Sequence, residues 1–301
     1  MRSMLPKRYR TGGVATVLAA LLLYTTTVCA AFAAEPDKKT DATHNNWTLV
    51  WSDEFNGPDG SLPDPAKWTL VTGGSGYGNR ELEAYTDRPL NVHQEKGNLV
   101  ITARKESFTG ADGIAREYTS GRLQTKGLFE TQYGRIEAKI KLPSGQGIWP
   151  AFWMMGSNFD TINWPDCGEI DIMEYIGSEP AMVHGSLHGP QYSGGDPLTG
   201  GYTLPNHARF SDAFHLFAIE WEPNVIRFYM DGKLFETQNS NSLPPFKHWA
   251  FNHPFYLLFD LAIGGFWPGN PDQTTVFPAT MLVDYVRVYK PVKTKTDPAV
   301  H

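Results

Sequence analysis

Residues 168–177 read GEIDIMEYIG and alternate acidic with apolar side chains, as a β-strand with one buried face does. Ile170 and Ile172 share one face of such a strand, which we expect to pack on a hydrophobic core. Glu169 and Asp171 share the opposite face, which we expect to look into solvent or a concavity. The stretch therefore predicts a strand whose outer face collects carboxyl groups.

A third acid, Glu174, does not fit this alternation. In a regular strand it would share the face of the isoleucines and point into the core, where an unpaired carboxylate is very costly. One extra residue at Ile172-Met173, a β-bulge, would return Glu174 to the face of the other two acids. We therefore expect a bulge at this position and three carboxyl groups in one cleft.

The chain after Trp47 continues in short β-rich runs separated by turn residues, without helical periodicity of useful length. Its 22 prolines and 29 glycines suit many turns, and Asp231-Gly232 suits the two-residue type I′ turn of a hairpin. These observations predict an all-β fold, an antiparallel β-sandwich of the jelly-roll kind. The expected strands lie within residues 98–105, 135–143, 147–156, 168–177, 215–222, 225–238, 255–265 and 281–290.

The N-terminus has the features of a secretory signal peptide. Basic residues precede the apolar run 14–24, and Ala31-Phe32-Ala33 forms a small-residue cleavage site. A membrane anchor is the alternative, but the run is shorter than the roughly 20 apolar residues that a span needs. We expect a secreted protein, extracellular or periplasmic, without a membrane segment after cleavage. The expected organisation is a signal peptide at 1–33, a disordered leader at 34–46, one domain at 47–290 and a tail at 291–301.

Composition excludes some classes of function. The net charge of −6 and the lack of a basic run argue against a nucleic-acid partner. Cys29 leaves with the signal peptide, so Cys167 has no partner for a disulfide and is expected to be a small buried thiol. Nine tryptophans in a chain with 19% charged residues must be either core side chains or stacking platforms.

Carboxyl groups at successive positions on one strand face suit a retaining glycosidase, in which two carboxyls lie roughly 5–5.5 Å apart. One ionised carboxylate attacks the anomeric carbon, and a protonated one protonates the leaving oxygen and later activates water. An Asp between them can orient the nucleophile. The alternative is a solvated strand edge with three scattered acids.

The same stretch resembles the active-site signature E-[IL]-D-I-x-E of glycoside hydrolase family 16. Six further segments resemble that family in its order, so the resemblance covers residues 47–290 and is closest to bacterial endo-1,3-β-glucanases, the laminarinases. It implies a concanavalin-like jelly roll with a concave glycan-binding cleft and a retaining mechanism. The segments are WSDEFNG (51–57), SGRLQTKG (120–127), GRIEAKIKLP (134–143), GIWPAFWMMG (147–156), DLAIGGFWPG (260–269) and MLVDYVRVY (281–289).

The resemblance implies roles for particular residues. Glu169 would be the nucleophile, Asp171 the assisting acid and Glu174 the acid/base. His188 is expected beside the acid/base on a neighbouring strand, and a turn-stabilising histidine is its alternative. The residues expected to bind substrate, with core packing or a structural ion pair as the alternatives, are Trp149, Trp153, Trp164, Trp267, Arg122, Asn79, Glu81 and His188.

The sequence departs from the family pattern at three positions: Arg80 and Glu83 stand where Asn and Gln are usual, and Asp260 where Asn is usual. Asp260 adds an acid near the cleft and could shift pH preference or specificity. No His/Cys cluster suggests zinc or iron. No cofactor is expected for catalysis, and a structural Ca²⁺ is expected at the positions that match the family's calcium site, which are Glu54, Gly97 and Asp284.

These expectations combine into a secreted, monomeric endo-β-glucanase. It would hydrolyse internal 1,3-β-glucosidic bonds of laminarin-like or mixed-linkage β-glucans by double displacement. The enzymatic alternatives are a lichenase, an agarase or a carrageenase of the same family, and a transglycosylase. A lectin-like glucan-binding module is the non-enzymatic alternative, but a binder has no need of Glu169 and Glu174.

Overall fold

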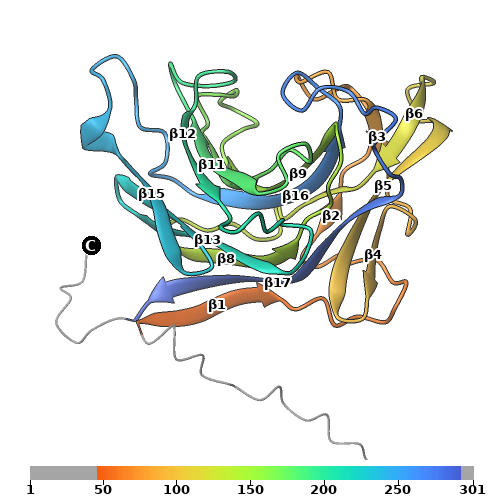
Figure 1. Ribbon diagram of the computed structural model, residues 1–301. Coiled ribbons are helices and arrows are strands. Elements are labelled where there is room, and N and C mark those ends of the chain that lie inside the picture. Colours follow the sequence, from red (N-terminus) through yellow and green to blue (C-terminus); the bar gives the residue numbers. More distant parts are fainter. Residues whose placement is uncertain (1–45, 293–301) are drawn as a thin grey trace, which may run out of the picture. The chain divides into compact units, whose positions relative to one another are not determined.

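The computed structural model describes residues 46–292, whose strands form two stacked sheets (Figure 1). The predicted signal peptide, the leader up to residue 45 and the tail beyond residue 292 lie outside the described residues. Within 46–292 the only helical element is one 3₁₀ turn, η2, at Ser240–Ser242. No helix of the described residues is long and apolar enough to cross a bilayer. The predicted all-β fold is confirmed.

The larger sheet has ten strands in the order β15-β14-β13-β8-β17-β5-β6-β3, with β1 paired to β17 and β4 paired to β5. Its pairs are antiparallel except β3 with β6. The strands are β1 (Trp47–Asp53), β3 (Glu83–Tyr85), β4 (Val92–Glu95), β5 (Asn98–Thr109), β6 (Ala115–Ser120), β8 (Gly134–Lys141), β13 (His215–Glu222), β14 (Val225–Met230), β15 (Lys233–Asn239) and β17 (Ala279–Pro291).

The smaller sheet has seven antiparallel strands in the order β12-β11-β10-β9-β16-β7-β2. Figure 1 shows its central strands as the upper layer, with connecting loops rising on both sides of it. Its members are β2 (Thr69–Leu70), β7 (Arg122–Gln124), β9 (Ile148–Gly156), β10 (Glu169–Glu174), β11 (Met182–His188), β12 (Leu198–Thr203) and β16 (Phe255–Ile263).

The core lies between the sheets and follows the predicted alternation. In β16, Phe255, Leu257 and Phe259 belong to the main core cluster, whereas Asp260 and Ala262 line the opposite face. Fully burying one such apolar side chain stabilises the fold by roughly 1.5–3 kcal/mol relative to leaving it exposed. The smaller sheet is thus fixed to the larger one from below, and its upper face is available for a site.

The turn between β14 and β15 and the pairing of the first and last strands follow the sequence pattern closely. Asp231 and Gly232 have φ of 45° and 75°, as the predicted type I′ hairpin turn between β14 and β15 requires. At the other end of the chain, β17 runs to Pro291, and the N–H of Val292 donates to the carbonyl of Asn46 at 2.8 Å. Pairing of the first and last strands therefore extends slightly past the expected limits of 47 and 290.

Candidate active site

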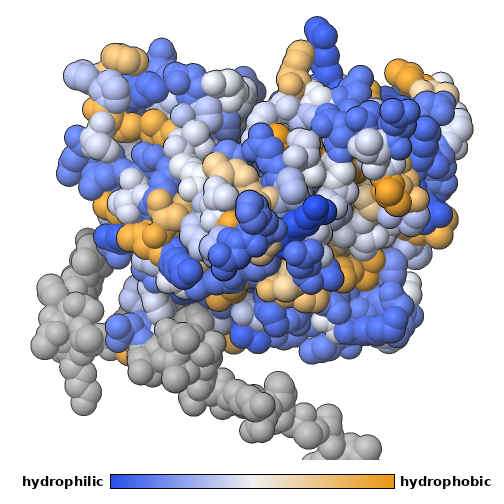
Figure 2. All heavy atoms as spheres, viewed as in Figure 1, coloured by the Kyte–Doolittle hydropathy of each residue, from blue (hydrophilic) through white to orange (hydrophobic). Residues whose placement is uncertain are grey.

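The outer face of the seven-stranded sheet holds a cleft of about 1000 Å³. In the view of Figure 2 the upper edge of the molecule is indented above this sheet. The three predicted catalytic residues and all eight predicted binding residues line the cleft: Glu169, Asp171, Glu174, Trp149, Trp153, Trp164, Trp267, Arg122, Asn79, Glu81 and His188. The structure therefore brings these residues together, and their individual roles stay predictions.

The three acids reach one cleft because β10 has the predicted bulge. Against β9, Asp171 pairs with Trp153, but the next pairs are Met173 with Phe152 and Glu174 with Ala151. The register against β11 shifts over the same residues. Both Ile172 and Met173 lie in the main core cluster, which consecutive residues of a regular strand would not do.

The bulge predicts how activity depends on the number of residues between Asp171 and Glu174. Deleting Met173 leaves Glu169, Asp171 and Glu174 at intervals of two, which a regular strand places on one face. We expect this variant to keep more activity than a Glu174→Gln variant. An Ala inserted after Met173 either turns Glu174 into the core or moves it two residues along the strand, roughly 6.6 Å. Its activity should fall to the level of Glu174→Gln.

Hydrolysis rates and melting temperatures of both variants would check this prediction. The control is an Ala inserted between Ser178 and Glu179, which changes chain length without changing the spacing of the acids. A deletion variant as inactive as Glu174→Gln, beside an active insertion variant of normal stability, would contradict the bulge account.

Burial is the main reason why the acids hold protons tightly. Asp171 is 2% exposed, and burial raises its pKa to about 8. Burial, assisted by the charge of Asp171, raises the pKa of Glu174 to about 8 and that of Glu169 well above its usual range. Three carboxyls so close together cannot all be ionised at neutral pH. The site therefore holds shared protons, including one available on Glu174.

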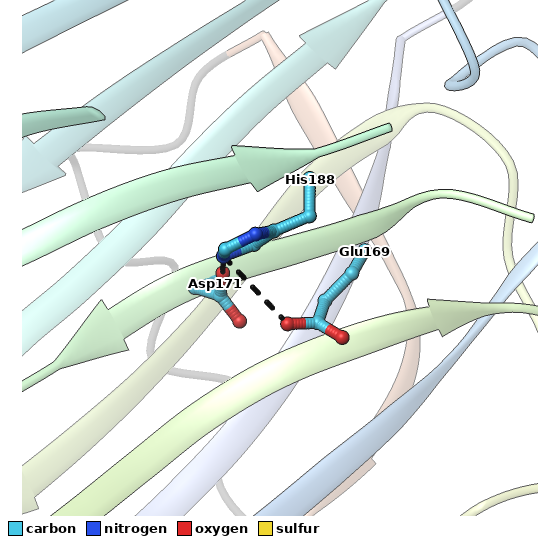
Figure 3. Close-up of side chains that lie close together, drawn as sticks. All are labelled: Glu169, Asp171 and His188. Atoms are coloured by element: carbon cyan, nitrogen blue, oxygen red, sulfur yellow. Dashed lines mark ion pairs between the residues drawn. The ribbon is translucent and has the colours of Figure 1, made fainter. Parts of the chain in front are cut away.

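His188 is hydrogen-bonded in a way that selects its tautomer. Its Nδ1 accepts the N–H of Gly194 at 3.1 Å, so the ring proton is assigned to Nε2. Nε2 lies 3.2 Å from Asp171 Oδ2 and 3.9 Å from Glu169 Oε1 (Figure 3). His188 comes from the neighbouring strand, as predicted, but the expectation that it flanks Glu174 is wrong. The antiparallel register pairs His184 with Glu174, and His188 with Glu169.

Glu174 is oriented by a tryptophan. The indole N–H of Trp149 donates to Glu174 Oε1 at 3.2 Å, and Ser186 also hydrogen-bonds this carboxyl. Trp149 in turn meets the ring of Trp267 edge-on at 5.5 Å, and Trp267 meets His184 at 5.3 Å. These contacts hold the carboxyl of Glu174 on the cleft face of the sheet.

The other two predicted binding tryptophans also line the cleft, Trp153 on its floor and Trp164 at its rim. Trp153 shares the cleft face with Trp149, as their common parity predicts, and is 8% exposed. It belongs to the small apolar cluster under the cleft that also contains Met155 and Cys167, so Cys167 is a buried thiol as predicted. Trp164 is 40% exposed and its ring lies 6.0 Å from that of His188. An exposed ring of this kind can stack on a sugar face.

A polar wall borders the floor on the side of β7. Asn79 Nδ2 donates to Glu81 Oε1 at 3.1 Å, and the hydroxyl of Tyr85 donates to Glu81 Oε2 at 3.1 Å. The guanidinium of Arg122 lies over the rings of Tyr77, at 4.7 Å, and Trp153, at 4.9 Å. This wall presents hydrogen-bond donors and acceptors to the cleft.

The departures from the family pattern have separate structural roles. Arg80 stacks on the exposed ring of Phe266 at 4.7 Å, at the rim of the cleft. Glu83 is fully buried behind the wall, where its Oε2 accepts the N–H of Ile263 at 2.7 Å. Asp260 does lie in the cleft, as expected.

Sequence reasoning missed several residues that line the cleft, among them Tyr77, His184, Ser186 and Phe266. For two of them a signal was present. In VHGSLH, residues 183–188, His184, Ser186 and His188 recur at every second position, so a strand that presents His188 to the cleft presents all three. Tyr77 and Phe266 lie outside the strands, and alternation gives no information about them.

The three expected calcium positions meet where β17 changes neighbours. β17 pairs with β5 up to Val283–Leu99 and with β1 from Val286–Asp53, so Glu54, Gly97 and Asp284 lie around that junction. Their side chains are already engaged. Arg287 holds both oxygens of Glu54, and Lys139 holds Asp284 Oδ2 at 2.7 Å. Backbone carbonyls and the second oxygen of Asp284 therefore remain as the donor set for a hard cation.

Among residues 46–292, one group of three potential metal ligands lies within 4.8 Å, namely Glu169, Asp171 and His188. Binding of a metal by His188 would need an unprotonated Nε2, whereas this nitrogen carries the ring proton and faces Asp171. The group is therefore better described as a close cluster of two acids and one imidazole.

Comparison with known proteins agrees with this geometry. The family model described as "Glycosyl hydrolases family 16" matches residues 81–287. A beta-glucanase of Rhodothermus marinus is 43% identical over 264 residues, which are 84% of this chain and 88% of the relative. An endo-beta-1,3-glucanase structure from Pyrococcus furiosus has a TM-score of 0.79 at 47% identity, covering 82% of this chain and 96% of that chain. The laminarinase catalytic domain of Thermotoga maritima has a TM-score of 0.78 at 46% identity, covering 82% of this chain and 100% of that chain.

Proposed function

The chain belongs to glycosyl hydrolases family 16 and is a glycoside hydrolase, and on this premise we propose that it hydrolyses internal 1,3-β-glucosidic bonds of β-glucans with retention. The observation that carries the proposal is the bulged strand β10, which aims Glu169, Asp171 and Glu174 into one aromatic-lined cleft. The printed names of the relatives favour a 1,3-β-glucan as substrate.

The first half of the proposed reaction forms a covalent intermediate. The carboxylate of Glu169 attacks the anomeric carbon while the bond from that carbon to the leaving oxygen breaks. Glu174 donates its proton to the leaving oxygen, and Trp149 holds Oε1 of this acid in place. In this proposal Asp171 keeps the proton that it shares with Glu169, so that Glu169 attacks as the ionised member of the pair. Nε2 of His188 lies 3.2 Å from Asp171 Oδ2.

The second half reverses these roles. The leaving sugar chain departs, and water takes its place beside Glu174, which is now a carboxylate. Glu174 removes a proton from the water as the oxygen attacks the anomeric carbon, and Glu169 leaves as a carboxylate. Two inversions at one carbon give net retention. The raised pKa of Glu174, about 8, suits a group that must begin each cycle protonated.

The substrate is tested by measuring release of reducing ends from laminarin, lichenan, agarose and carrageenan. We expect hydrolysis of laminarin, because the cleft has neutral aromatic platforms and few basic groups for a sulfated chain. Long oligosaccharides at early times would show internal cleavage. Hydrolysis of agarose or carrageenan alone would sink the glucanase proposal and leave the carboxylate mechanism standing.

We also propose that the protein is exported, because residues 1–33 have the features of a cleaved signal peptide. Determining the N-terminal residue of the protein recovered outside the cytoplasm tests this directly. A start near Ala34 is expected, and an intact Met1 on the exported protein would contradict cleavage.

We further propose that Ca²⁺ binds at the junction of β1, β5 and β17 and stabilises the fold. At a calcium concentration of about 100 times Kd the melting temperature should rise by roughly 5–10 °C over a chelated sample. Asp284→Asn should remove most of this rise, whereas Asp212→Asn, which changes an exposed loop acid, should not. An equal rise in all three proteins would argue against this site.

A further inference from the structure

Two carboxyls, Glu81 and Asp260, lie in the cleft outside the catalytic strand. Asp260 is 6% exposed on β16, where it pairs with Ala151 of β9 on one side and with Arg122 of β7 on the other. Ala151 pairs from its other side with Glu174. One row across the sheet therefore runs Glu174, Ala151, Asp260 and Arg122.

One small side chain separates the two acids of this row. Neighbouring strands lie roughly 4.8 Å apart, so about 9.6 Å of sheet separates the backbone of Glu174 from that of Asp260. Between them stands only the methyl group of Ala151, which is 7% exposed. A sugar ring held next to Glu174 would thus lie beside the wall that Asp260 supports.

Asp260 accepts a hydrogen bond from Trp153 and lies beside Tyr85 of that wall. The indole N–H of Trp153 donates to Oδ1 at 2.6 Å, and the hydroxyl of Tyr85 lies 3.3 Å from Oδ2. Hydrogen bonds to an ionised acceptor are shorter and about twice as strong as neutral ones. The position of the Trp153 ring therefore depends on Asp260.

Arg122 depends on Trp153 in turn. Its guanidinium is clamped between the rings of Trp153 and Tyr77, and its buried Nε has no hydrogen-bond partner. The rings, rather than hydrogen bonds at Nε, keep this cation in place, and the charge of Asp260 opposite offsets its own. Asp260 thus acts on the binding wall at two points, through Trp153 and through Arg122.

We propose that Asp260 is a positioning residue for substrate binding, whose carboxylate anchors Trp153 and balances Arg122 so that the wall beside the catalytic acids keeps its binding geometry. The proposal rests on the proposed hydrolase function and adds a role for an acid outside the catalytic strand. Since Asp260 holds the wall rather than the reacting atoms, its loss should act on KM more than on kcat.

The ionisation of Asp260 makes this role pH-dependent. Burial raises its pKa to about 6, and the positive charge of Arg122 acts in the opposite direction. As pH falls through this value the carboxyl gains a proton, its hydrogen bond from Trp153 weakens, and the negative charge that faces Arg122 is reduced. We therefore expect substrate binding to weaken between about pH 7.5 and pH 5. The other titratable groups facing Asp260 are Glu81, Tyr85 and Tyr77 on the wall and Asp171 on β10.

Asp260→Asn removes the negative charge of the side chain and preserves its shape. The Asn side chain can still accept from Trp153 with its oxygen, and its amide can donate to the oxygen of Tyr85. At about pH 7.5 we expect KM to rise roughly 5–10-fold, as expected when charge-assisted hydrogen bonds become neutral ones, with kcat within about two-fold. KM should then vary little with pH. Asp260→Ala also frees Trp153 and should raise KM further.

The experiment measures kcat and KM on laminarin from about pH 5 to pH 8 for the parent, both Asp260 variants and Glu236→Gln. The last is a control, because Glu236 is a partly buried acid whose pKa burial also raises, to about 7, but it lies on β15 of the larger sheet. A KM of Asp260→Asn that matches the parent across this range would overturn the proposal. So would a loss confined to kcat.

A binding measurement keeps the test independent of turnover. Calorimetric titration of a laminari-oligosaccharide into Glu169→Gln and into Glu169→Gln/Asp260→Asn should show the same 5–10-fold weakening near pH 7.5. Equal affinities would overturn the role of Asp260. If the parent does not cleave laminarin but cleaves another glycan of the panel, the proposed substrate fails, and the Asp260 comparison is made with that glycan.

Discussion

Glu169→Gln is expected to lower kcat on laminarin by about 10⁴–10⁶-fold, on the scale seen when an enzyme loses its nucleophile. The amide oxygen of Gln cannot displace the leaving sugar, whereas the shape of the side chain and its contacts in the cleft are preserved. The affinity for substrate should change little, because Glu169 does not belong to the binding wall. Initial rates and a calorimetric Kd measure the two effects separately.

The control for this substitution is Glu236→Gln, which removes a carboxylate on β15 of the larger sheet, outside the cleft lining, and should retain parental kcat. Glu169→Ala, which has a smaller side chain, allows a chemical test of which face of the sugar is attacked. Azide can enter the space vacated by the side chain and attack from the same side of the sugar, giving an α-glycosyl azide. A β-glycosyl azide, or near-parental hydrolysis by Glu169→Gln, would show that another residue is the nucleophile.

Glu174→Gln is expected to lower kcat/KM on laminarin by about 10²–10⁴-fold, the range for loss of a general acid. The loss should be much smaller for an aryl glycoside whose leaving group needs no proton. In the parent, hydrolysis should decline as pH rises through about 8, because Glu174 then loses the proton it must donate. Asp171, whose pKa burial also raises to about 8, loses its proton in the same range, so the leaving group decides the test. An equal loss on laminarin and on the aryl glycoside would assign the acid role elsewhere.

The same raised pKa has a consequence for stability. The folded protein holds the proton of Glu174 up to about pH 8, whereas an unfolded glutamic acid releases it near pH 4.3. The folded state therefore binds more protons between these values, and stability falls as pH rises through this window. The Glu174→Gln side chain does not titrate, so this loss of stability with rising pH is absent from the variant. Its melting temperature should exceed that of the parent at pH 8 and match it near pH 4. A lower melting temperature at pH 8 would contradict the burial of this acid.

Alternation within single strands was enough to predict much of the site. It placed Glu169 and Asp171 on one face, required the bulge for Glu174 and put Trp149 and Trp153 on the same side of β9. These inferences hold because the side chains of a strand point to opposite faces in turn, whatever the strand pairs with.

Relations between strands could not be predicted in this way. His188 faces Asp171 rather than Glu174 because of the antiparallel register of β11, which no local pattern specifies. The row from Glu174 to Arg122 joins strands far apart in sequence, so the neighbourhood of Asp260 is visible only in the folded chain. Loop residues such as Tyr77 likewise follow from tertiary packing.

The most direct test of the account is to trap the covalent intermediate and locate it. A 2-deoxy-2-fluoro β-laminaribioside with an activated leaving group should form a glycosyl-enzyme that breaks down slowly, because the fluorine destabilises both transition states. Digestion and mass spectrometry should find one added disaccharide on the peptide that contains GEIDIMEYIG, attached at Glu169. A label on Glu174, Asp171 or Asp260 instead would contradict the assignment of the nucleophile to the bulged strand's first acid.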